Sequence, residues 1–158
     1  MKSVVMYGSR YGNTERVARA IADGLRVYGE VELTAVTEAP VTLAGADLVV
    51  IGGPTEAHGD TPAVEGFLDD LHTGALDGMH AAAFDTRLDW PRWLSGSAGA
   101  AITNRLNKLG ADVVAPPASF VVEGKVPQLK PGELDRASAW GDTLGRAVIA
   151  EVPALRQR

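Results

Sequence analysis

Cysteine is absent from this chain of 158 residues, and aromatic side chains make up only 6% of it. The absence of cysteine excludes disulfide frameworks, thiolate nucleophiles and cysteine-ligated zinc or iron–sulfur sites. Long apolar runs are also lacking, since the longest candidate, residues 48–53, has the length of a buried strand. The first residues show no signal-peptide pattern. We therefore expect a soluble, cytoplasmic protein that does not bind membranes.

Acidic residues outnumber basic ones by 20 to 15, and the excess is concentrated in one segment. Residues 56–89 contain eight acids and one base, Arg87, whereas the rest of the chain has a small positive surplus. Nucleic-acid binders need Lys and Arg for contacts with phosphate, so DNA and RNA are not expected partners. The segment is either a solvated helix face or, if a site lies beside it, a surface that attracts a basic partner protein.

Strand-like apolar runs alternate with helical periodicity along the whole chain, which is the pattern of βαβ units. The expected strands cover residues 3–7, 31–36, 47–52, 79–84 and 112–122, the last one interrupted by Pro116-Pro117. The expected helices cover residues 13–28, a segment starting at 61–62, a segment between 97 and 110, and about 132–150. Right-handed crossovers between parallel strands then predict one α/β domain over residues 1–158, an open sheet with helices on both faces.

Ligands of such sheets bind beyond the carboxyl ends of the strands. Three loops follow the first, third and fourth expected strands, at residues 8–13, 53–60 and 85–96. These loops are the candidate site.

The first loop has the composition of an anion-binding site. It contains three hydroxyl groups, on Ser9, Tyr11 and Thr14, and it ends where a helix exposes unpaired backbone N–H groups. Gly12 would let the backbone approach a ligand closely. The lysine-containing loop of triphosphate sites and the Gly-x-Gly-x-x-Gly loop of dinucleotide sites are both missing. The alternative is an ordinary helix start capped by a serine or an asparagine.

This loop, Ser-Arg-Tyr-Gly-Asn-Thr at residues 9–14, resembles the FMN-phosphate loop of the flavodoxin family, Thr/Ser-x-Thr-Gly-x-Thr. The similarity continues through Gly-Gly-Pro-Thr at 52–55, Phe-Asp-Thr-Arg at 84–87 and Lys-Leu-Gly at 108–110, and it is to the short-chain form. The resemblance implies a flavodoxin-like, doubly wound, five-stranded parallel sheet of order 2-1-3-4-5 in a three-layer α/β/α sandwich. It also implies one non-covalent FMN and a carrier of single electrons between a reductase and an acceptor protein.

The same resemblance assigns cofactor contacts to all three loops. The phosphate contacts fall on Ser9, Arg10, Tyr11, Gly12, Asn13 and Thr14, with Tyr11 in place of the usual threonine. The ring contacts fall on Pro54, Thr55, Glu56, His58, Gly59, Asp85, Thr86, Arg87 and Trp90.

Two positions of the ring site depart from the family pattern. Glu56 stands where a tryptophan is usual, so His58 is our candidate for the inner stacking residue, the alternative being an ordinary exposed loop histidine. Gly59 is the candidate for a peptide that turns its carbonyl toward N5 of the flavin. The three histidines, His58, His72 and His80, lack the spacing of metal ligands, so no metal site is expected.

The loop after the fourth strand would contact the other side of the ring. Asp85 and Thr86 are well placed for the pyrimidine edge, and Arg87 would stabilise negative charge near N1 or else pair with Asp85 or Asp89. Trp90 is the candidate for the outer stacking residue, in preference to Trp93. Trp140, in the last helix, is expected to pack in the core.

We expect a monomer that docks transiently on basic-surfaced redox partners. Two alternatives remain open. One is an FMN-dependent oxidoreductase acting on a small molecule such as a quinone or a porphyrin precursor. The other is a flavodoxin-like binding module without cofactor.

Overall fold

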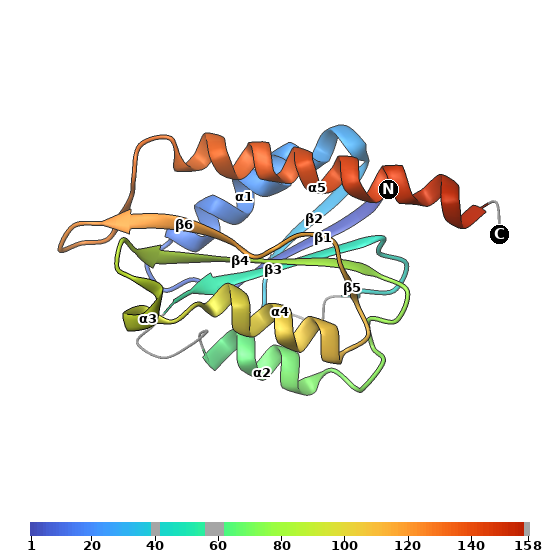
Figure 1. Cartoon of the computed structure of the whole chain (residues 1–158), viewed down its shortest axis with the longest axis horizontal. Helices are drawn as coiled ribbons and strands as arrows, with labels where there is room; N and C mark the ends of the chain where they lie inside the picture. Colours follow the sequence, from blue (N-terminus) through green and yellow to red (C-terminus); the bar gives the residue numbers. More distant parts are fainter. Residues whose placement is uncertain (39–41, 56–61, 157–158) are drawn as a thin grey trace.

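One sheet forms the middle layer of the molecule, and helices cover both of its faces (Figure 1). The computed structural model describes residues 1–38, 42–55 and 62–156. Five parallel strands form the body of the sheet in the order β2-β1-β3-β4-β6. Their bounds are β1 Lys2–Tyr7, β2 Glu30–Ala35, β3 Leu48–Pro54, β4 His80–Leu88 and β6 Ala118–Glu123. Two short strands, β5 Asp112–Val113 and β7 Gln128–Leu129, pair with β4 and with β6.

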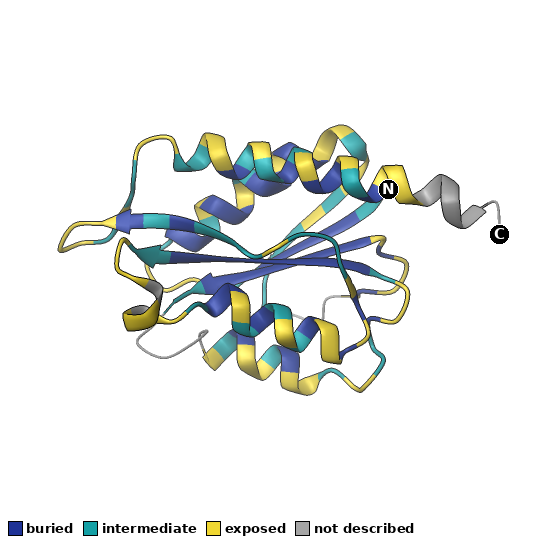
Figure 2. Ribbon diagram, viewed as in Figure 1, coloured by how far each residue is buried: buried dark blue, intermediate teal, exposed yellow. Residues whose placement is uncertain are grey.

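The helices form two layers with separate apolar interiors (Figures 1 and 2). The bounds of the four long helices are α1 Asn13–Leu25, α2 Pro62–Asp70, α4 Ala98–Lys108 and α5 Glu133–Arg156. Helices α1 and α5 pack on one face of the sheet, and α2 and α4 pack on the other. Successive strand residues point to opposite faces, so Val4 and Met6 pack against α2 and α4 while Val5 packs against α1.

Sequence periodicity predicted this architecture, and the fold class is confirmed. The predicted fifth strand is divided, because Pro116 and Pro117 lack the N–H groups that a strand needs to continue its ladder. Strand β5 therefore pairs with the first residues of β4, and β6 pairs with residues 84–88. The antiparallel strand β7 was not predicted.

The end of β4 was predicted wrongly. We expected this strand to end at Phe84, but its pairing with β6 carries it to Leu88. Asp85, Thr86 and Arg87 consequently lie on a strand, and their side chains alternate between the two faces of the sheet.

Two short helical elements complete the fold. Helix α1 is followed by one 3₁₀ turn, Arg26–Tyr28, and the short helix α3, Arg92–Ser95, lies between β4 and α4. Within the described ranges, no helix is long and apolar enough to cross a membrane.

Candidate functional site

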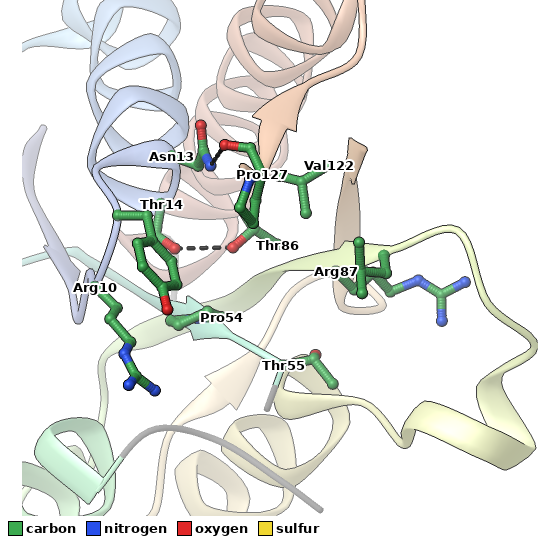
Figure 3. A pocket seen from close by; sticks show the side chains of 11 residues that line it. Arg10, Asn13, Thr14, Pro54, Thr55, Thr86, Arg87, Val122 and Pro127 are labelled. Atoms are coloured by element: carbon green, nitrogen blue, oxygen red, sulfur yellow. Dashed lines mark hydrogen bonds between the residues drawn. The ribbon is translucent and has the colours of Figure 1, made fainter. Parts of the chain in front are cut away.

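A pocket opens at the carboxyl edge of the sheet, between the loop after β1, the end of β4 and the turn joining β6 to β7 (Figure 3). It has a volume of about 140 Å³. Eleven residues line it: Arg10, Tyr11, Asn13, Thr14, Pro54, Thr55, Thr86, Arg87, Leu88, Val122 and Pro127. Eight of these were predicted from the sequence. The other three were missed. Leu88 lies next to Arg87 on β4 but was not assigned, and Val122 and Pro127 reach the pocket only because β6 pairs with β4.

Helix α1 begins at the pocket without a side-chain cap. Gly12, at the N-cap position, has a φ of 86°, and a β-carbon there would meet no atom within 4 Å. The Ser9 hydroxyl oxygen accepts a hydrogen bond from the Gly12 N–H at 3.1 Å, and it caps no helical N–H group. The capped-start alternative is therefore not what the loop adopts, and no side chain caps the first N–H groups of α1.

Thr14 and Thr86 face one another across the floor of the pocket. Their hydroxyl oxygens are 2.8 Å apart and hydrogen-bonded, and both residues are almost fully buried. One of the two hydroxyls donates to the other, so the second keeps its proton available for another acceptor. The bond joins the first turn of α1 to β4, which are 72 residues apart in the sequence.

Asn13 connects the first loop to the turn between β6 and β7, which forms another side of the pocket. Its side-chain amide donates a 2.8 Å hydrogen bond to the carbonyl oxygen of Pro127, in the turn before β7 (Figure 3). One side-chain N–H is thus taken by a structural contact, and the other side-chain N–H and the backbone N–H are the donors that Asn13 would offer to a ligand.

Arg10 and Tyr11 form the outer rim of the pocket. The guanidinium carbon of Arg10 is 5.5 Å from the centre of the Tyr11 ring, within the range of a cation–π interaction. Tyr11 is 67% exposed. The rim therefore combines a positive charge with an aromatic face.

Asp85 does not line the pocket, in contrast to our assignment. It is fully buried, and its Oδ2 accepts hydrogen bonds of 2.9 Å from the Ser97 hydroxyl and from the Gly99 N–H. Ser97 caps α4, and Thr55 accepts a hydrogen bond from the Ala98 N–H at 3.0 Å. These contacts fix the start of α4 beneath the loops after β3 and β4, so Asp85 supports the site from below.

Arg87 lines the pocket at the end of β4, and in Figure 3 its guanidinium extends away from the Thr14–Thr86 pair. Its Nε and Nη1 atoms are buried and have no hydrogen-bond partner within the described part of the chain. The two carboxylates proposed as alternative partners are engaged elsewhere, Asp85 at α4 and Asp89 with Lys130 at 2.8 Å. Arg87 is thus a half-buried cationic residue beside the pocket, with two buried guanidinium nitrogens that have no partner among the described residues.

The predicted outer stacking residue, Trp90, is not among the residues that line the pocket. Trp90 is 58% exposed and Trp93 83% exposed, and neither lines it. Glu56, His58 and Gly59 lie outside the described residues. Trp140 packs edge-to-face against Phe84 and Phe120, as expected.

Comparisons with known proteins match this architecture. The sequence model of the flavodoxin family matches residues 5–141. The chain belongs to the flavodoxin family. A flavodoxin from Clostridium saccharobutylicum is 28% identical over 112 residues, covering 69% of this chain and 68% of the relative. Proteins of this family bind FMN and transfer electrons, so FMN is the cofactor of the family to which the chain belongs.

Solved structures show the same fold. A flavodoxin from the domain Archaea superposes with a TM-score of 0.79 at 21% identity, over 94% of this chain and 99% of that one. Rubredoxin oxygen:oxidoreductase from Desulfovibrio gigas gives 0.77 at 24% identity, over 96% of this chain but 37% of its own. The chain therefore corresponds in fold to about a third of that longer protein.

The residues at the start of α1 suit the phosphate of FMN. A dianionic phosphate needs several donors and a partial positive charge, and an uncapped helix N-terminus offers both. Thr14 adds a hydroxyl in the pocket and Arg10 adds a full charge at its rim. Ser9 and Gly12, also predicted, are not among the lining residues but lie in the same loop, where the Ser9 hydroxyl accepts from the Gly12 N–H. Gly12 leaves the space that a side chain would fill.

Proposed function

We propose that this chain is an FMN-binding electron carrier that receives electrons singly from a reductase and passes them to an acceptor protein. Bound FMN supplies the redox chemistry, since its ring exchanges one or two electrons. The observation that carries the proposal is the uncapped start of α1, which opens into the pocket with Gly12 at positive φ and Thr14 hydrogen-bonded to Thr86.

In this proposal the three loops contact different parts of FMN. Ser9, Arg10, Tyr11, Thr14 and the backbone of Gly12 and Asn13 hold the phosphate. Thr86 and Arg87 face the pyrimidine side of the ring, where Arg87 stabilises the negative charge that reduction adds. Pro54 and Thr55, which line the pocket at the end of β3, contact the ring.

The size of the pocket agrees with a carrier. Pockets that enclose a whole drug-sized ligand have roughly 300–1,000 Å³, and this pocket has about 140 Å³. The described lining residues would enclose only part of FMN. In the proposed carrier, the part of the ring that they leave open exchanges electrons with another protein.

The phosphate assignment is tested by comparing FMN with riboflavin, which lacks the phosphate. Ser9→Ala and Thr14→Val should each weaken FMN binding by roughly tenfold or more, because a hydrogen bond to a charged group contributes about 1.5–3 kcal/mol. Riboflavin binding should change by less than about twofold. Thr143→Val, which removes a hydroxyl bonded to Ala139 on α5, is the matched control. Equal weakening of both ligands would contradict the assignment.

The carrier assignment is tested by stepwise photoreduction of the FMN-loaded chain, followed by its visible spectrum. A carrier of single electrons should be reduced in two separate one-electron steps. A single two-electron step, together with turnover of a quinone or porphyrin precursor without a protein acceptor, would favour the oxidoreductase alternative. If the chain does not bind FMN, the alternative that remains is a flavodoxin-like binding module without cofactor.

A further inference from the structure

A cluster of one histidine and two carboxylates lies at the end of the sheet opposite the pocket. His80 begins β4, Asp112 begins β5, and Glu151 lies on the last part of α5. Nδ1 of His80 is 3.2 Å from Oδ2 of Asp112 and 3.6 Å from Oε2 of Glu151. The nitrogen and one oxygen from each carboxylate all lie within 4.8 Å of one another.

His80 is the member of the cluster that points to a ligand. The residue is only 9% exposed, and its Nδ1 atom is buried. This nitrogen makes no hydrogen bond within the described residues, although it lies beside two carboxylate oxygens. Buried polar atoms in proteins nearly always have a partner. The nitrogen is therefore directed into the space between two anionic groups without bonding to either.

We propose that His80, Asp112 and Glu151 bind a divalent transition-metal ion, and that Zn²⁺ fits them best. Zinc bonds of about 2.0–2.2 Å in a tetrahedral arrangement separate neighbouring donor atoms by roughly 3.3–3.5 Å. The two measured separations, 3.2 and 3.6 Å, bracket this value. Imidazole is a common ligand of zinc and of other late transition metals, whereas Ca²⁺ and Mg²⁺ take oxygen donors.

The three ligands lie on regular elements of the fold, two strands and one helix. His80 and Asp112 are direct neighbours in the β4–β5 ladder. The backbone N–H of His80 donates to Asp47, and that of Asp112 donates to Met79. Glu151 follows Val148 by three residues on α5, and Val148 is fully buried. Only the carboxylates would need to adjust when the ion binds.

The side chains of Asp112 and Glu151 are 66% and 52% exposed. Solvent therefore reaches the ion from the side of the carboxylates, and the fourth ligand is a water molecule or another small donor. Because the ligands come from β4, β5 and α5, a bound ion would join the end of α5 to the sheet.

The metal site is independent of the proposed FMN site. His80 and Thr86 are six residues apart on one strand, which corresponds to roughly 20 Å at about 3.3 Å per residue. Metal binding and flavin binding can thus be measured separately, and the failure of one assignment leaves the other intact.

The test is a calorimetric titration of the untagged, FMN-supplemented full chain with Zn²⁺ after treatment with a chelator. We expect one equivalent of Zn²⁺ to bind through this site. Asp112→Asn and Glu151→Gln should each weaken binding at least about tenfold, since even outer-shell changes at metal sites cost 10–100-fold. Zn²⁺ should also raise the Tm of the parent chain by several degrees, and this increase should be lost in Asp112→Asn.

The control variants test whether an acid or a histidine outside the cluster contributes to Zn²⁺ binding. His72→Gln and Glu65→Gln change exposed residues outside the cluster and should leave Zn²⁺ binding unchanged. Asp112 and Glu151 are exposed, so their variants should fold even if His80→Gln does not. The proposal is overturned if Zn²⁺ does not bind, or if it binds equally well to the double variant Asp112→Asn/Glu151→Gln.

Discussion

At the scale of single residues, the hydroxyl pair of Thr14 and Thr86 joins the candidate site to the stability of the fold. The two residues were assigned to different parts of the cofactor, and the structure places their hydroxyls 2.8 Å apart. A bond between buried groups leaves an unsatisfied partner when one group is removed, and that partner pays a desolvation cost.

Thr14→Val should therefore lower the free energy of unfolding of the flavin-free chain by about 1–2 kcal/mol. The double variant Thr14→Val/Thr86→Val should cost clearly less than the sum of the two single variants, because it leaves no unpaired hydroxyl. Urea denaturation at neutral pH measures all three. Strictly additive costs would show that the two hydroxyls do not depend on one another.

Gly12 is a second residue whose role follows from its backbone. Its φ of 86° lies in the left-handed region, and a β-carbon would meet no neighbour. Gly12→Ala should cost roughly 1–2 kcal/mol from backbone strain alone. Gly12→Asn should cost less, since asparagine tolerates this conformation better. If both variants were as stable as the parent in urea, this result would contradict the left-handed conformation of Gly12.

At the scale of elements, α1 and α5 pack unusually closely through glycine. A methyl group on Gly24 would overlap the backbone carbonyl of Ser138, and one on Gly141 would overlap that of Ile21. Glycine inside a helix normally costs stability relative to alanine. Here it allows the backbones of two helices to approach.

Gly24→Ala should destabilise the fold by about 1–3 kcal/mol, as overpacking does in other cores. Gly66→Ala is the control, because Gly66 lies on α2 and a β-carbon there meets nothing within 4 Å. That control should stabilise the chain by roughly 0.5–1 kcal/mol. Thermal or urea unfolding distinguishes the two variants by the sign of the change.

The start of α5 is tied to β6 by Glu133. Its pKa lies below the usual value near 4.5, mainly because Arg136 donates a hydrogen bond to the carboxylate, with help from the Val121 N–H. A lowered pKa in the folded chain stabilises the fold above the unfolded pKa, and this contribution is lost as pH falls through the lowered value.

Glu133→Gln should therefore reduce stability at pH 7, by about 1 kcal/mol, and should reduce the loss of stability on acidification below about pH 4.5. Urea midpoints measured from pH 3 to pH 7 test this. Asp135→Asn, in the same turn, is the control and should keep the parental slope. If the urea midpoint of Glu133→Gln changed with pH as steeply as that of the parent, the role assigned to this carboxylate would be contradicted.

At the scale of the whole molecule, the acidic segment at residues 56–89 is less uniform in the folded chain than in the sequence. Asp85 is buried, Asp69 pairs with Arg105, and Asp89 pairs with Lys130. Ion pairs cancel much of the field that a carboxylate would project toward a partner. The attraction of a basic partner thus depends on the acids that remain unpaired.

Lys130→Gln would leave Asp89 without its cation close to the end of β4. In the proposed carrier, this variant should speed electron transfer to a basic protein acceptor by about twofold at low salt, and the gain should disappear at high ionic strength. Stopped-flow rates at two salt concentrations measure the effect. Lys108→Gln, at the far end of α4, is the control. A gain that persisted at high salt would argue against electrostatic steering.

Which features could be predicted depended on how far apart their residues lie in the sequence. The five parallel strands and the four long helices were predicted because periodicity and glycine act within windows of a few residues, whereas β7 and α3 were not predicted. The end of β4 was missed because β6, not β4 itself, sets it. The histidine cluster was missed because His80, Asp112 and Glu151 come from three elements and form no short motif.

The sequence by itself determined the alternation of strands and helices and the hydroxyl-rich, glycine-containing composition of the loop before α1, because both depend only on neighbouring residues. Only the tertiary structure decided that Thr14 bonds to Thr86, that Asp85 supports α4, and that Val122 and Pro127 wall the pocket. Each of these contacts joins residues brought together by strand register and by helix packing. Such contacts depend on the path of the whole chain, which no local pattern records.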